Sequence, residues 1–435
     1  MSISSDVARD IDRVLRPLEG HGLYQNNAFR VTGLPTDVSP RRVRRHREET
    51  QNPYYVTPVP DTDVPLPPSD DADALRAAFE VLRDPLARLV HELFWLRPGQ
   101  ASWHEHAVFA HCRALEATAP DGKVADAGTW DDWRSGLRLL AQAFTADETW
   151  EWVRRRAAEI DDPRLSVAVL RALRERLPEH VIGVSVGLAV RAAGASRAQA
   201  DPHLEALRRA GFDPRVVREV TRAAVEPSAG RVRAACETAR SADPAVGLSA
   251  ARDLLDGTAA ALKTITTVLG ADDDLAAACQ DEVAHVVNNR VVGYVNEHLD
   301  GVSGAPPTAP ALALLRRART LASARSVTEL VDKNVADLEE LAALVGRGAR
   351  RPAPARRGTP PPLRDAMPGR PAAARQVNVG CLPLLIFFAF GAWTSWWLLN
   401  LLDIGPVWPV VGAVLGGFVT VGLAVRVIAF FQDLR

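Results

Sequence analysis

Two long uncharged apolar runs near the C-terminal end constrain this chain more than any other feature. The first covers residues 379–402; the second covers residues 407–425 and resumes after Arg426 as far as Phe431. A bilayer core about 30 Å thick is crossed by roughly 20 apolar residues in a helix. The runs therefore predict a transmembrane hairpin with spans at about 379–402 and 407–431.

Basic residues flank this hairpin on one side, because the link at 403–406 contains no Lys or Arg. Positive flanks stay in the cytoplasm. We therefore expect a two-span inner-membrane protein with both ends cytoplasmic, whose flanking arginines also contact anionic lipid. These arginines are Arg350, Arg351, Arg356, Arg357, Arg364, Arg370, Arg375 and Arg426.

Cysteine usage and the N-terminal sequence agree with a cytosolic soluble part. The four cysteines lie far apart, at Cys112, Cys236, Cys279 and Cys381, so no metal-binding CxxC spacing occurs. The start, MSISSDVARDIDRVLRPLEG, is polar and lacks a signal-peptide pattern. The abundance of Ala and Arg, with little Lys, points to a GC-rich bacterial genome.

Residues 27–97 follow an N-terminal segment, 1–26, and have a distinctive order of helix signals. Ser39 and Pro40 begin a predicted helix as N-cap and first residue. A proline-rich loop covers 52–68, a second helix begins near Asp70, and a third begins at Pro85. The first of these helices has a basic face that is a candidate partner-binding surface, formed by Arg41, Arg42, Arg44, Arg45 and Arg47.

This order resembles the J-domain family of co-chaperones, most closely in the stretch AFEVLRDPLARLVHE. The resemblance implies a helical J-like fold for 27–97 and a heat-shock chaperone as a possible partner. The family stimulates its partner's ATPase through a His-Pro-Asp tripeptide, and residues 51–71 contain none. The matching residues are Phe29, Val31, Gly33, Leu34, Ser39, Val43, Ala78, Phe79, Val81, Leu82, Asp84, Pro85 and Arg88.

Residues 98–347 predict about ten helices and almost no strand. Proline and capping signals indicate helix starts at Pro178 and Pro227, and a capping box at Ser326 indicates another. No repeat of fixed length is evident, so the expected architecture is an all-α body, either an α-solenoid or an irregular bundle. Residues 348–376 form a Pro- and Arg-rich linker.

The densest cluster of chemically capable residues is WHEHAVFAHC, with His104, His106, His111 and Cys112. A helical zinc pair needs ligands four residues apart on one face, which this spacing does not provide. Phosphate-loop, dinucleotide and nucleophile-elbow motifs are also missing. We therefore expect no catalytic residues, metal or cofactor, and no nucleic-acid binding.

These features predict a non-enzymatic, membrane-anchored helical scaffold or chaperone-like adaptor that binds protein partners. One alternative is an active J-domain co-chaperone that works without the tripeptide. Another is a subunit of a channel or transporter that oligomerises through glycines of the hairpin, such as Gly416 and Gly417.

Overall fold

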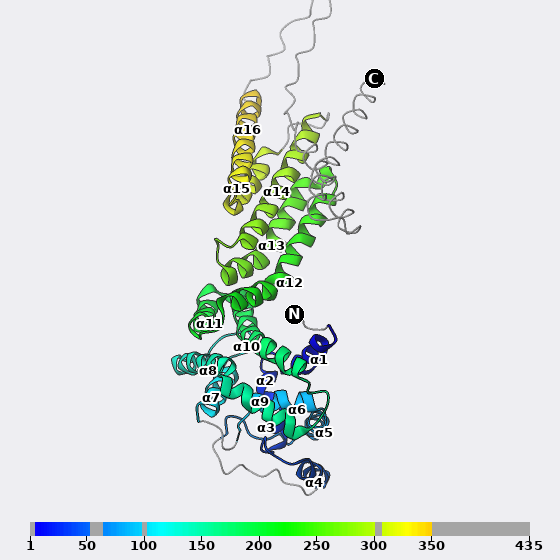
Figure 1. Ribbon diagram of the computed structural model, residues 1–435. Coiled ribbons are helices and arrows are strands. Elements are labelled where there is room, and N and C mark those ends of the chain that lie inside the picture. Colours follow the sequence, from blue (N-terminus) through cyan, green and yellow to red (C-terminus); the bar gives the residue numbers. More distant parts are fainter. Residues whose placement is uncertain (1–4, 53–63, 98–101, 301–306, 350–435) are drawn as a thin grey trace, which may run out of the picture. The chain divides into compact units, whose positions relative to one another are not determined.

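The computed structural model describes residues 5–52, 64–97, 102–300 and 307–349 (Figure 1). They are helical throughout, with one isolated bridge between Thr118 and Val124 and no strand among them, which confirms the all-α prediction. The elements are α1 (Ser5–Leu15), η1 (Arg16–Leu18), α2 (Gly22–Gln25), α3 (Ala28–Thr32), α4 (Pro40–Thr50), α5 (Ala72–Val81), α6 (Pro85–Leu93), α7 (Ser102–Glu116), α8 (Ala127–Thr145), α9 (Asp147–Ile160), α10 (Val167–Ala195), α11 (Arg197–Arg209), α12 (Pro214–Ser241), η2 (Pro244–Val246), α13 (Gly247–Leu269), α14 (Asp274–Asp300), α15 (Thr308–Leu321) and α16 (Arg325–Ala349).

The chain divides into two units, 1–353 and 354–435, and all described residues belong to the first. None of the described helices is long and apolar enough to cross a membrane. The predicted hairpin at 379–431, the arginines that flank it and almost all of the linker lie outside the described residues.

Helix starts that depend on local capping agree with the sequence. The Ser39 hydroxyl accepts a hydrogen bond from the Arg42 amide at 3.3 Å, and Pro40 is the first residue of α4. The Asp84 carboxylate accepts bonds from the Leu86 and Ala87 amides at 3.0 and 3.1 Å and caps α6. Such side chains satisfy amides that the first helical turn leaves unbonded.

Two predicted starts are wrong, and a third differs from the observed start by one residue. Pro178 and Pro227 lie inside the long helices α10 and α12, and Ser326 is the second residue of α16 rather than its cap. Proline removes one helix hydrogen bond and opposes the preceding turn. Both helices continue because residues on each side of the proline, such as Leu177 and Val181, are fully buried in the tertiary structure.

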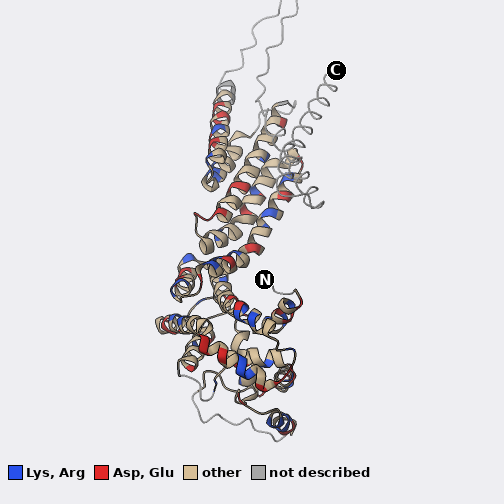
Figure 2. Cartoon of the chain, in the orientation of Figure 1, with Lys and Arg blue, Asp and Glu red and all other residues tan. Residues whose placement is uncertain are grey.

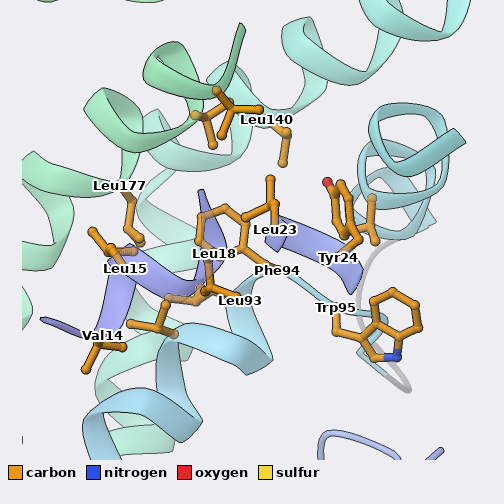
Figure 3. Close-up of a cluster of buried hydrophobic side chains, with 14 of the residues drawn as sticks. Val14, Leu15, Leu18, Leu23, Tyr24, Leu93, Phe94, Trp95, Leu140 and Leu177 are labelled. Carbon is orange, nitrogen blue, oxygen red and sulfur yellow. The ribbon is translucent and has the colours of Figure 1, made fainter. Parts of the chain in front are cut away.

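The first hydrophobic cluster joins the N-terminal helices to the body. Leu15, Leu18 and Tyr24 pack with Phe94, Leu140 and Leu177 in one core (Figure 3). These side chains come from α1, η1, α2, the end of α6, α8 and α10. Residues 27–97 therefore share a core with the helices that follow them rather than forming a core of their own.

The second cluster is built from α12 to α16, the end of α10 and Ala200 of α11. Each helix contacts the next in the chain, and α12 also contacts α14, α13 contacts α15 and α14 contacts α16. Across the α14–α16 interface, Asn334 donates a hydrogen bond to the buried Asn288 at 2.8 Å. Sequential neighbours are therefore also spatial neighbours, because the connections are short.

Gly136 lies where α8 passes close to the backbone of α7. A Cβ atom there would lie 2.6 Å from the His111 backbone nitrogen, whereas a Cβ atom on Gly257 of α13 would meet nothing within 4 Å. We expect Gly136→Ala to destabilise the protein by about 1–3 kcal/mol through overpacking. Gly257→Ala should instead stabilise it by about 0.5–1 kcal/mol. Urea unfolding of both variants checks this, and a shift of both midpoints in one direction would contradict it.

Candidate partner-binding surfaces

The basic helix α4 is fixed to the protein by two buried side chains, Val43 and His46. His46 Nε2 donates a hydrogen bond to the Thr32 carbonyl oxygen at 2.8 Å. The imidazole ring also packs edge-on against Phe79 of α5, with 5.9 Å between ring centroids. These contacts turn one face of α4 inward and leave the opposite face to solvent.

The five arginines of α4 divide into two groups. Arg42 pairs with Glu49 at 3.0 Å, and Arg47 pairs with Glu80 of α5 at 3.2 Å. Arg41, Arg44 and Arg45 are exposed and have no ion pair with any residue that the structure describes. In Figure 2, the blue colour of Lys and Arg covers much of the α4 ribbon.

The charge of Arg42 is therefore balanced by Glu49 of the same helix. Desolvation acts to raise the pKa of Glu49, but hydrogen bonds and charges from His46 and Arg42 together bring that pKa below its usual value. Arg47 likewise helps to lower the pKa of Glu80, after the hydrogen bond from Arg83. What remains for a partner is the outward face with Arg41, Arg44 and Arg45, together with the exposed Glu48.

The residues that resemble the J-domain pattern lie together in the first hydrophobic cluster. Gly33 ends α3 in the left-handed region, at φ 67°, a conformation that suits glycine. Arg88 is buried and donates a hydrogen bond to the Val38 carbonyl oxygen at 2.6 Å, just before α4. The apolar members in this cluster are Phe29, Val31, Leu34, Val43, Ala78, Phe79 and Leu82, and Val81 packs against it.

Sequence reasoning missed a buried network of charges around Glu92. This carboxylate has no solvent exposure; it pairs with Arg88 at 2.9 Å and with Arg156 of α9 at 2.7 Å. Arg156 binds both carboxylate oxygens, because a second bond of 2.9 Å reaches Oε1. The only sequence signal is an Arg and a Glu four residues apart inside the apolar segment PLARLVHEL.

The histidines of the segment WHEHAVFAHC do not come together in one site, because each has different surroundings. His104 is buried, and its Nε2 lies 3.2 Å from the Leu93 carbonyl oxygen. His111 Nδ1 lies 2.8 Å from the Tyr24 hydroxyl oxygen, and its ring packs edge-on against Trp133. His106 is exposed. Within the described part of the chain, no three His, Cys, Asp or Glu residues are placed to hold a metal ion.

Burial shifts the pKa values of the histidines and of the cysteine in this region toward their neutral forms. It lowers the pKa of His91 to about 4 and of His111 to about 3. Burial, followed by the charge of Arg97, lowers the pKa of His104 to about 3. Burial raises the pKa of the Cys112 thiol, so that it is not an activated nucleophile.

A groove of about 670 Å³ opens between α1 with η1, α10 and α12. Between Val181 and Ala189 of α10, every residue is buried except Gly183 and Gly187, which form part of the groove floor. Val216 and Val220 of α12 add apolar surface. The sequence analysis did not predict this groove, because the glycines of α10 do not indicate which other helices form its walls.

Ion pairs occupy most of the charged rim of the groove. Arg176 of α10 bonds to Asp12 of α1 at 2.7 Å and to Glu179 at 2.6 Å. His180 Nε2 donates to the Leu18 carbonyl oxygen at 3.0 Å and holds η1 against α10. These bonds attach the N-terminal helix along one side of the groove and leave the floor open.

No protein-family model, curated protein or solved structure matches this chain. Function is therefore inferred from its own residues and contacts.

Proposed function

We propose that the protein is a non-enzymatic adaptor that is anchored in the inner membrane by its C-terminal hairpin and binds protein partners through its helical unit. The observation that carries this proposal is the outward face of α4. Arg41, Arg44 and Arg45 are exposed without ion pairs in the described part of the chain, on a helix whose other face is fixed by Val43 and His46. Such a face complements an acidic protein surface.

The finer architecture is part of the same proposal. A J-like arrangement of residues 27–97 is supported by the common packing of the residues that resemble the family pattern, and by the caps at Ser39 and Asp84. A solenoid-like body is supported by the contacts of α12, α13 and α14, each of which packs against the next two helices in the chain. Both arrangements present helix faces, rather than an enclosed active site, to other proteins.

Charge reversal on α4 tests the adaptor function. We expect Arg41→Glu/Arg44→Glu/Arg45→Glu to lower recovery of crosslinked partners from membranes at least tenfold, because three favourable charge contacts become repulsive. The measurement is quantitative mass spectrometry of partners crosslinked to the full-length protein in membranes.

The matched control is Arg154→Glu/Arg155→Glu/Arg171→Glu. It reverses three exposed arginines elsewhere in the same unit and should retain the partners. Equal recovery by both triple variants, or a turnover activity of the purified protein, would contradict the adaptor proposal.

Co-chaperone activity is the second candidate, favoured by the packing of the J-like residues. The measurement that separates it from a passive adaptor is ATPase stimulation of the cognate heat-shock chaperone by the full-length protein. Stimulation that is lost in the α4 variant would establish co-chaperone activity. Chaperone binding without stimulation would instead agree with an adaptor that lacks the tripeptide.

A further inference from the structure

The charges on the outward face of α4 follow a definite order along the helix. Residues three, four and seven positions apart lie on one face of an α-helix. Arg44, Arg45 and Glu48 have these spacings from Arg41, and all four side chains are exposed. The face therefore presents three arginines over its first two turns and a carboxylate about 10 Å from Arg41 along the axis.

This order of charges is the reverse of the one that stabilises a helix. The macrodipole favours acidic side chains in the first turn and basic side chains in the last turn. The first turn of α4 contains Arg41 and no acid, whereas Glu48 lies in the last turn. Arg41 and Arg45, four residues apart, also repel each other. The stability of α4 therefore does not account for this arrangement of charges.

Glu48 is not neutralised by its own helix. It lies four residues after Arg44 and three after Arg45, a spacing that permits ion pairs. In the described part of the chain it nevertheless forms no ion pair with either arginine, and the other carboxylate of the helix, Glu49, pairs with Arg42. Glu48 and the three outward arginines are therefore all available to a partner.

The net charge of this surface is small. Asp37 is exposed just before the N-cap, so the side chains without an ion pair between residues 37 and 48 of the described chain are three arginines and two carboxylates, a net charge of +1. Such a sum attracts an acidic partner only weakly. Nucleic acid or an anionic membrane would also bring like charges against Asp37 and Glu48. The order of the charges therefore distinguishes partners better than their sum does.

We propose that the outward face of α4 binds a polypeptide segment of a partner protein with the complementary order of charges, in which carboxylates face the three arginines and a basic side chain faces Glu48. This inference rests on the docking role proposed above for α4 and specifies the partner of that surface. Carboxylates suit arginines because a guanidinium can donate two parallel hydrogen bonds to one of them. Opposite charges at the two ends of the contact also fix the direction of the bound segment.

An exchange of two charges tests the order without changing the sum. Arg41→Glu/Glu48→Arg keeps the composition and the net charge of α4 and reverses the order. We expect the full-length variant to lower recovery of crosslinked partners from membranes at least tenfold, because both contacts become repulsive. Its unfolding midpoint in urea should not fall, because an acid near the start of a helix and a base near its end are favourable.

The matched control is Glu151→Arg/Arg154→Glu, which exchanges two exposed charges of α9 and should retain the partners. Unchanged recovery in the α4 exchange, together with a loss in the triple charge reversal, would overturn the complementary order and leave the docking role of α4 intact. Unchanged recovery in both α4 variants would contradict the docking role as well. An equal loss in the α9 control would also overturn the complementary order.

A single substitution separates order from net charge by the sign of its effect. Glu48→Arg makes the surface more positive, so attraction by net charge alone predicts greater recovery of partners. The complementary order predicts a loss of about threefold or more, because the basic side chain of the partner then meets another base. Greater recovery of partners by Glu48→Arg would overturn the proposal.

Binding measurements with defined probes identify the class of ligand. The probes are the peptide segment that is crosslinked to α4, a twin peptide with its acidic and basic residues exchanged, a short DNA duplex and mixed micelles with an anionic lipid. We expect the segment to prefer the wild type and the twin to prefer Arg41→Glu/Glu48→Arg, each at least tenfold. The triple charge reversal on α4 should not change binding of DNA or lipid. A segment without this preference, or a loss of DNA or lipid binding in the triple variant, would overturn the proposal.

Discussion

Replacement of Glu92 with alanine is expected to destabilise the protein by about 3–5 kcal/mol, because it leaves the buried charge of Arg88 without a counter-charge and leaves Arg156 with only the exposed Glu159. The side chains of Arg88 and Arg156 are only 8% and 15% exposed, so water cannot take the place of the carboxylate. The network joins α6 to α9 and to the segment before α4. Urea unfolding of the full-length protein, followed by far-ultraviolet circular dichroism, measures the loss.

The control for this prediction is Glu159→Gln. Glu159 also pairs with Arg156, at 2.8 Å, but its side chain is 63% exposed. An exposed pair contributes about 1 kcal/mol or less, so this variant should unfold almost as the wild type does. Replacement of Arg88, Glu92 and Arg156 together by apolar residues of similar size should cost less than Glu92→Ala. A loss below about 1 kcal/mol in Glu92→Ala would show that Glu92 does not carry the network.

Acidification from pH 7.5 to pH 5 is expected to remove at least roughly 6 kcal/mol of stability, because burial lowers the pKa of six histidines of the described chain and three of them alone account for this loss. The pKa of His91 falls to about 4, and those of His104 and His111 to about 3, through burial. The unfolded chain has histidine pKa values near 6.5. The unfolded state therefore binds more protons in this interval, and each histidine contributes about 2 kcal/mol that is present above pH 6.5 and lost as the pH falls.

A substitution of His91 tests how much one buried histidine contributes to this pH dependence. Its Nδ1 accepts a hydrogen bond from the Ala28 amide at 2.9 Å, so protonation would place two hydrogens against each other. His91→Asn keeps an acceptor near that position and cannot take up the proton. We expect it to reduce the loss of stability by about 2 kcal/mol, whereas the control His106→Asn changes an exposed position and should not have this effect. Unfolding free energies of these variants at both pH values provide the measurement, and an unchanged slope in His91→Asn would contradict the prediction.

Local chemistry made part of the fold predictable. Ser39 with Pro40, and Asp84 with Pro85, begin helices because capping and the fixed backbone angle of proline act within a few residues. The same rules failed at Pro178 and Pro227, where the tertiary structure buries apolar side chains on both sides of the proline and the helix continues. The prediction of ten helices between residues 98 and 347 is nevertheless consistent with α7 to α16.

The candidate binding surfaces were harder to predict than the helix starts, because tertiary contacts decide which side chains remain available. The sequence indicated a basic helix at 40–50, but all five of its arginines appeared equivalent. The structure separates Arg47 from Arg41, Arg44 and Arg45, because its partner Glu80 comes from another helix. The groove could not be predicted, because its walls come from helices that are distant in the chain, as the bond from Arg176 to Asp12 illustrates.

The sequence by itself determined that the described chain is helical, where most of its helices begin, and that α4 is basic, because periodicity, caps and composition act over short distances. Only the tertiary structure decided which charges are buried, which arginines remain free and where a groove opens. Those properties depend on side chains that meet from distant parts of the chain, as Glu92 meets Arg156 and Asp12 meets Arg176.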